Sequence, residues 1–170
     1  FNYYAFKAIY LHEMDRFRRT LTQSLLSPVL TTSLYFIVFG SVIGGYVEKI
    51  DGISYGSYIV PGLLMLTLLT QSISNTSFGI FFPKFNGTIY EILAAPISTF
   101  EIVLAFVGAG ATKTLLVGAV IFVTSLFFTE VSVQYPILMI FLLILVSFTF
   151  ALFGFLIGVL SSNFEQMSII

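Results

Sequence analysis

Four apolar stretches, each about 20 residues or longer, constrain this chain more than any other feature of its sequence. A helix rises about 1.5 Å per residue, so a stretch of this length crosses a hydrocarbon layer of about 30 Å. Only 9% of the residues are charged and 58% are hydrophobic, whereas about 25% of an average soluble domain is charged. Such a chain has too few polar residues to form the surface of a soluble domain. The sequence therefore predicts an all-α, polytopic transmembrane domain covering residues 1–170, with spans at 29–46, 58–81, 104–128 and 137–160.

The segment before the first span, residues 1–26, is predicted to be an amphipathic helix that lies in the membrane interface. One face is apolar, because its members recur at spacings of three or four residues: Phe6, Tyr10, Met14, Phe17, Leu21 and Leu25. The other face is basic, and Arg16, Arg18 and Arg19 are expected to contact anionic membrane lipids. A soluble helix packed on another domain is the alternative, although no other domain is visible. Pro28 is expected to mark the change of direction into the first span.

The placement of cations predicts the orientation. With a cytoplasmic N-terminus, Lys7, Lys84 and the three arginines lie inside and Lys49 lies outside, as the positive-inside rule requires. We therefore expect a multi-pass protein of a bacterial inner or plasma membrane, and no nucleic acid partner. The absence of cysteine excludes a disulfide framework, a cysteine zinc site and a thiol nucleophile.

The stretch GTIYEILAAPISTFE, residues 87–101, is predicted to form a short helix on the cytoplasmic side between the second and third spans. Thr88 and Glu91 fit a capping box, which would start the helix. Pro96 lacks a backbone donor and disfavours helical geometry in the preceding residue, so the helix can run only to about residue 95. Ser98 and Glu101 repeat the capping pattern just before the third span.

A helix this short is marginal alone, so another surface must pack on it. Ile89, Leu93 and Ile92 are expected to form one apolar face, with Tyr90 and Glu91 pointing elsewhere. The functional interpretation is a docking helix. The alternative is an ordinary loop that reverses the chain direction between two spans, in which the capping residues only satisfy the backbone groups at the helix ends near the membrane.

The same stretch resembles the cytoplasmic loop of ABC-type exporter permeases of the type 2 class. The resemblance covers nearly the whole chain, because a basic amphipathic helix leads into LLSPVL, the second span contains YIVPGLLMLTLLTQSI, and NFEQMSII follows the fourth span. In that family the loop is a coupling helix that fits a groove on the nucleotide-binding subunit. The resemblance thus implies a docking role for Thr88, Ile89, Tyr90, Glu91, Leu93 and Pro96. Such permeases usually have six spans, so either two lie outside this sequence or the chain departs from the family.

The resemblance also implies a function. The chain would be the membrane-spanning permease subunit of an ATP-driven exporter that moves a hydrophobic or amphipathic substrate outward, such as a drug, a lipid or a lipid-linked saccharide. Two permease subunits, expected to be a homodimer, would work with two nucleotide-binding subunits. GAGATKT lacks the glycine that a phosphate loop needs before its lysine, so we expect no ATP site in it and assign hydrolysis to a separate subunit or a missing segment. We expect this chain to be a permease subunit with no enzymatic activity, cofactor or metal of its own. ATP and Mg would be bound by the partner subunit.

Several polar residues inside the spans are candidates for the translocation path. Lys113 either snorkels to the cytoplasmic edge or lines the path and binds an anionic head group. Gln71, Ser74 and Asn75 form a polar stripe that either joins helices or lines the path. Two other functions remain open at this point: an ion-coupled carrier that uses Lys113 and the stripe, and a non-transporting scaffold that anchors a partner through the loop.

The motifs GSVIG, residues 40–44, and GFLIG, residues 154–158, place small residues four apart in apolar helices. This spacing lets two helix backbones approach closely. We expect these motifs to pack helices within one subunit, with a subunit interface as the alternative.

Overall fold

The computed structural model describes residues 2–43, 45–46 and 52–168. Its elements are α1 (Tyr3–Arg19), α2 (Leu21–Tyr35), the π-helical η1 (Phe36–Ile43), α3 (Tyr55–Asn86), α4 (Ile89–Ala94), α5 (Thr99–Phe128), α6 (Pro136–Leu160) and α7 (Phe164–Ser168). Four stretches in the described part of the chain are long and apolar enough to cross a membrane: Leu21–Gly40, Tyr55–Asn86, Thr99–Phe128 and Pro136–Leu160. The predicted all-α transmembrane fold with four spans is confirmed.

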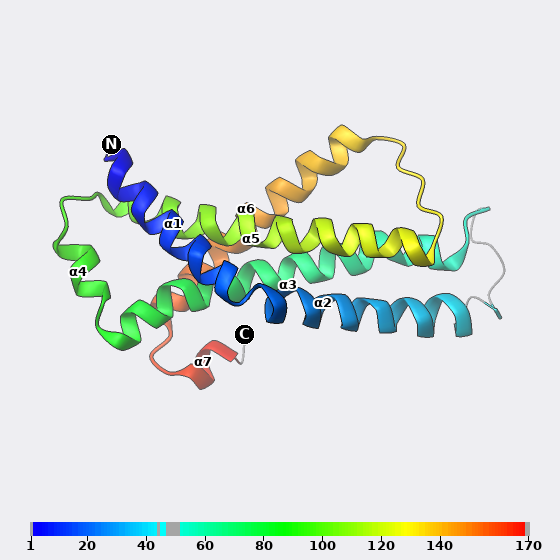
Figure 1. Cartoon of the computed structure of the whole chain (residues 1–170), viewed down its shortest axis with the longest axis horizontal. Helices are drawn as coiled ribbons and strands as arrows, with labels where there is room; N and C mark the ends of the chain where they lie inside the picture. Colours follow the sequence, from blue (N-terminus) through cyan, green and yellow to red (C-terminus); the bar gives the residue numbers. More distant parts are fainter. Residues whose placement is uncertain (1, 44, 47–51, 169–170) are drawn as a thin grey trace.

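Helices α3 and α5 pack together and carry α4 between them at one end of the bundle, opposite residues 52–54 (Figure 1). At about 1.5 Å per residue, the 32 residues of α3 and the 30 residues of α5 extend about 48 and 45 Å. Both helices are longer than the hydrocarbon layer, which is about 30 Å thick. Helix α4 therefore lies at one end of two continuous helices that are long enough to extend past the bilayer.

Small residues let the spans pack closely. A Cβ atom added at Gly154 would lie 2.5 Å from the carbonyl oxygen of Ile73, and one at Gly158 would lie 2.6 Å from that of Ser77. The GFLIG motif of α6 therefore packs against α3 within the chain, as predicted. In the other motif, Gly44 lies outside the described residues.

Gly154→Ala should lower the free energy of unfolding by about 1–3 kcal/mol, because the added methyl group meets backbone atoms of α3 that cannot rotate away. Gly108→Ala on α5 is the matched control, since a Cβ there meets nothing within 4 Å. It should be neutral or stabilising by up to about 1 kcal/mol, as expected from helix propensity. Thermal unfolding in detergent measures both, and equal effects of the two variants would contradict this packing.

A lysine near the end of α3 also fixes α6. Lys84 Nζ donates hydrogen bonds of 2.7 Å and 2.8 Å to the carbonyl oxygens of Val159 and Ser161. These oxygens lie at the C-terminal end of α6, where carbonyl groups lack partners within the helix and a cation is favourable. The ends of α3 and α6 are thus joined on the side of the bundle that carries α4.

The predicted boundary of the first span is wrong. The chain breaks at Thr20, between α1 and α2, and α2 continues through Pro28. The backbone N–H of Thr20 donates to the carbonyl oxygens of Arg16 and Phe17, and its hydroxyl group donates to the same two atoms. Thr20 therefore satisfies carbonyls that the end of α1 leaves free. The predicted single helix over residues 1–26 is two helices, and residues 21–28 belong to the span.

Candidate functional site

The loop between α3 and α5 contains the predicted short helix, but the capping box at its start does not form. Helix α3 ends at Gly87, whose φ of 80° is a left-handed conformation that glycine adopts without steric cost. Thr88 follows at once and is itself helical, with φ −61° and ψ −19°, and its side chain makes no capping bond. A capping threonine needs an extended backbone. The tight turn at Gly87 leaves no room for one, so Thr88 and Glu91 do not cap α4.

The second predicted capping box, at the start of α5, does form. Ser98 Oγ accepts a hydrogen bond from the N–H of Glu101 at 3.3 Å, and Glu101 Oε2 accepts one from the N–H of Ser98 at 2.8 Å. The other carboxylate oxygen of Glu101 accepts a hydrogen bond from the N–H of Asn2, and the Asn2 side chain donates to the carbonyl of Pro96 at 3.4 Å. The loop that follows α4 is therefore bonded to the start of α1.

Helix α4 has an inner and an outer apolar face. Ile89 and Ile92 pack against a buried cluster formed by α3 and α5, which consists of Ile80, Ile102 and Phe106. Tyr90 and Leu93 point outward and are 73% and 59% exposed. The prediction that Ile89 and Leu93 share one face is wrong, because the neighbouring spans take up Ile89 and Ile92. Tyr90 and Leu93, three residues apart on one turn of helix, form what we call the outer face of α4.

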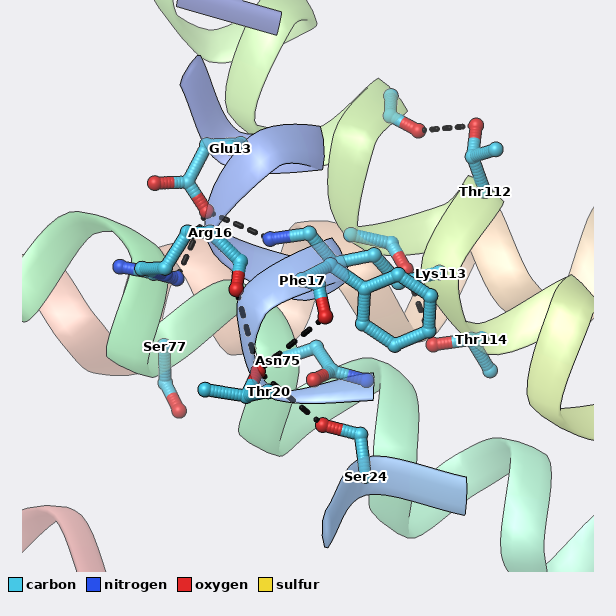
Figure 2. A network of polar contacts seen from close by, with 12 residues as sticks. Glu13, Arg16, Phe17, Thr20, Ser24, Asn75, Ser77, Thr112, Lys113 and Thr114 are labelled. Carbon is cyan, nitrogen blue, oxygen red and sulfur yellow. Dashed lines mark hydrogen bonds and ion pairs between the residues drawn. The ribbon is translucent and has the colours of Figure 1, made fainter. Parts of the chain in front are cut away.

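A buried ion network joins α1 to α5 (Figure 2). Glu13 Oε2 lies 2.7 Å from Lys113 Nζ and 2.7 Å from Arg16 Nη2. Glu13 and Lys113 are each 2% exposed. The expectation that Lys113 snorkels to the membrane edge is therefore wrong, because its amine meets a carboxylate inside the protein.

The sequence-based predictions do not include Glu13, although its spacing from neighbouring apolar residues indicates a buried position. Ile9, Glu13 and Phe17 follow one another at spacings of four, which places the carboxylate on the buried face of α1. Gly79 on α3 makes room for it, since a Cβ added there would lie 3.3 Å from Glu13 Oε2. A carboxylate on an apolar helical face predicts a buried partner, and Lys113 is that partner.

Two further contacts fix α1 along α5. The hydroxyl groups of Tyr10 and Thr112 form a hydrogen bond of 3.0 Å. Phe17 enters the core cluster that contains Leu68 and Val117. Together with the ion network, these contacts pack α1 against the bundle. Its position in the membrane interface stays a prediction.

A cavity of about 550 Å³ lies between the α1–α2 junction and α3. We call it the polar cavity because most of its lining residues have polar side chains, although carbon atoms supply much of the lining surface. The predicted path residues Gln71, Ser74 and Asn75 line its α3 side. Its other side contains Arg16 and Ser24. Lys113 does not line this cavity, so the structure brings together three of the four predicted path residues and separates the fourth.

The three arginines predicted to contact lipid differ in their surroundings. Arg18 and Arg19 are exposed, and Arg18 forms a solvent-exposed ion pair with Asp15 at 4.0 Å. Arg16 instead turns toward Glu13 and the cavity. The prediction that Arg16 belongs to the outer basic face is therefore wrong, whereas the lipid contacts of the other two stay a prediction.

The structure is a bundle of membrane-length helices with one short, exposed helix at its end. The chain belongs to the ABC-2 type transporter family, whose model matches residues 4–170. It is 37% identical over 166 residues to the inner membrane transport permease YadH of Escherichia coli strain K12, and the match covers 98% of this chain and 65% of that relative. YadH of Shigella flexneri matches with the same identity and coverage. No solved structure matches the chain significantly. The resemblance to type 2 ABC permeases is confirmed.

Proposed function

We propose that this chain is the permease domain of an ATP-driven exporter of a bacterial inner membrane, and that α4 docks onto a separate nucleotide-binding subunit. The observation that carries the proposal is the outer face of α4. Tyr90 and Leu93 are largely exposed on a helix at one end of α3 and α5, which are long enough to extend past the bilayer. An aromatic ring beside an aliphatic side chain is the kind of anchor that fits a pocket on a protein partner.

The remaining parts of the proposal follow from the family and from the names of the relatives. The relatives are transport permeases of the inner membrane. For this chain we propose a cytoplasmic N-terminus, a homodimer of permeases, ATP and Mg bound by the partner subunit, and outward movement of a hydrophobic or amphipathic substrate.

The contacts of α4 suggest how ATP binding would reach the spans. Ile89 and Ile92 connect α4 to α3 and α5 through a buried cluster that also contacts Ile9 of α1. Helix α1 is bonded to α5 at both Glu101 and Lys113. A shift of α4 would therefore be transmitted through this cluster to α3, α5 and α1. The polar cavity lies between the α1–α2 junction and α3, so such a shift would reach its walls. ATP would favour one arrangement through its different contacts with the two states.

The ion-coupled carrier is less consistent with the geometry. Its proposed coupling site combines Lys113 with the polar stripe, yet Lys113 is buried against Glu13 and lies outside the cavity that the stripe lines. A neighbouring gene that encodes G-x-x-x-x-G-K-[ST] would favour the ATP-driven exporter over both the carrier and the scaffold.

The proposed topology is tested by cysteine labelling, since the sequence contains no cysteine. In intact cells an impermeant maleimide should label Ile53→Cys, and should label Arg18→Cys, Thr88→Cys and Asn163→Cys only after the membrane is opened. All four positions are exposed. Labelling of Thr88→Cys in intact cells would place α4 outside the cell and remove the docking function.

A further inference from the structure

We propose that the polar cavity binds the head group of an anionic amphiphile, with Arg16 as the counter-ion of its phosphate or carboxylate. The binding of this ligand does not depend on the proposed function. Only its role as the transported substrate rests on that function. It narrows the substrate class from any hydrophobic or amphipathic molecule to one with a negatively charged head.

The charge balance of the buried network is the first argument. Glu13 supplies one negative charge, while Lys113 and Arg16 supply two positive charges, so the network carries a net charge of +1. Among the described residues that line the cavity, Arg16 is the only charged one. The Arg16 side chain is about one-third exposed, so its surplus charge is only partly hydrated. An anion in the cavity would neutralise it.

The geometry of Arg16 is the second argument. Its Nη2 atom donates to Glu13, and no other hydrogen bond of its guanidinium group is found among the described residues. A guanidinium group has five N–H donors in a planar fork that matches phosphate and carboxylate oxygens. In Figure 2 the other terminal nitrogen of Arg16 points away from Glu13. The side chain is 32% exposed, so a ligand can reach it.

The rest of the lining suits an amphiphile. Hydroxyl and amide groups from two sides of the cavity, among them Ser24, Gln71 and Asn75, can bond to head-group oxygens. Phe78 and Phe82 lie one helical turn apart on α3 in the same lining, and both rings are about half exposed. The cavity therefore has a polar part for a head group beside an aromatic part for an apolar chain. Its volume of about 550 Å³ lies in the usual range for small-molecule sites.

The test uses the full-length protein purified in a neutral maltoside detergent without an ATPase, so its result does not depend on docking. Titration calorimetry measures three probes: dodecyl phosphate, inorganic phosphate and dodecyltrimethylammonium. We expect saturable binding of dodecyl phosphate and none of the cationic amphiphile. Arg16→Gln should weaken dodecyl phosphate binding about 10-fold or more, because one charge-assisted contact is lost. Arg19→Gln is the matched control, since Arg19 is exposed on the same helix and outside the cavity.

A second variant keeps the test decisive if Arg16→Gln does not fold. Ser74 is exposed at the cavity wall and is not part of the ion network, so Ser74→Leu should fill the cavity and block binding while thermal stability is retained. Wild-type affinity in both Arg16→Gln and Ser74→Leu would overturn the site. Equal affinity for inorganic phosphate and dodecyl phosphate would contradict the proposal that the ligand is an amphiphile, and would indicate a site for soluble phosphate instead.

Discussion

Glu13→Ala should destabilise the folded protein by about 3–5 kcal/mol, because it leaves a buried lysine without its carboxylate partner. Lys113 would then face Arg16 with no anion between them. Asp15→Ala is the control on the same helix. It removes an exposed ion pair at 4.0 Å and should cost less than about 1 kcal/mol. Unfolding by heat or denaturant in detergent measures both variants.

Lys113 should contribute less to the stability of the folded protein than Glu13. Lys113→Met removes a buried charge and leaves Glu13 paired with Arg16, so it should cost less than Glu13→Ala. Combining the two substitutions should recover much of the stability lost in Glu13→Ala, because no lysine then remains unpaired. A Glu13→Ala protein as stable as the Asp15→Ala protein would contradict the buried network.

Leu93→Asp should abolish association with the nucleotide-binding subunit, and with it transport, while the membrane domain remains folded. A carboxylate placed at a buried contact would have no partner, which weakens binding by about 2–5 kcal/mol. Asn163→Asp adds the same charge at an exposed position before α7 and should leave association unchanged. Co-purification and ATPase rate of the co-expressed subunits measure the effect.

The two apolar faces of α4 should respond differently. Ile92→Asp puts a carboxylate against the cluster of Ile80, Ile102 and Phe106, so it should lower the stability of the permease itself. Leu93→Asp should leave that stability unchanged, because Leu93 points away from the bundle. If Leu93→Asp keeps wild-type association and transport, the loop is only a connection between two spans.

The sequence predicted the number and nature of the spans, because only helices of sufficient apolar length can cross a bilayer alone. It located the ends of helices less well. Hydropathy predicts the third span at residues 104–128, whereas α5 begins at Thr99 next to its capping box. Helix α3 likewise continues to Asn86, past the apolar block that ended at residue 81. Both helices continue past their apolar blocks into segments that contain polar residues, so hydropathy does not report their ends.

The features that sequence reasoning missed depend on which helices meet. Glu13 and Lys113 are 100 positions apart, and only the packing of α1 on α5 pairs them. Which of Ile92 and Leu93 faces inward depends on where the neighbouring spans lie. Proline is the stronger local signal, so the sequence predicts the break at Pro28. The end of α1 is instead set by the hydrogen-bond donors that Thr20 supplies.

The claim that α4 contacts a nucleotide-binding subunit is tested most directly by photo-crosslinking in the membrane. The full-length chain would carry p-benzoylphenylalanine in place of Tyr90. The control replaces Ile53, which precedes the start of α3, whereas α4 follows the end of α3. After illumination, mass spectrometry identifies the attached protein. We predict that the Tyr90 position captures an ATPase that contains G-x-x-x-x-G-K-[ST] and that the Ile53 position does not. A permease that transports its substrate while the Tyr90 position captures only lipid would contradict the docking function.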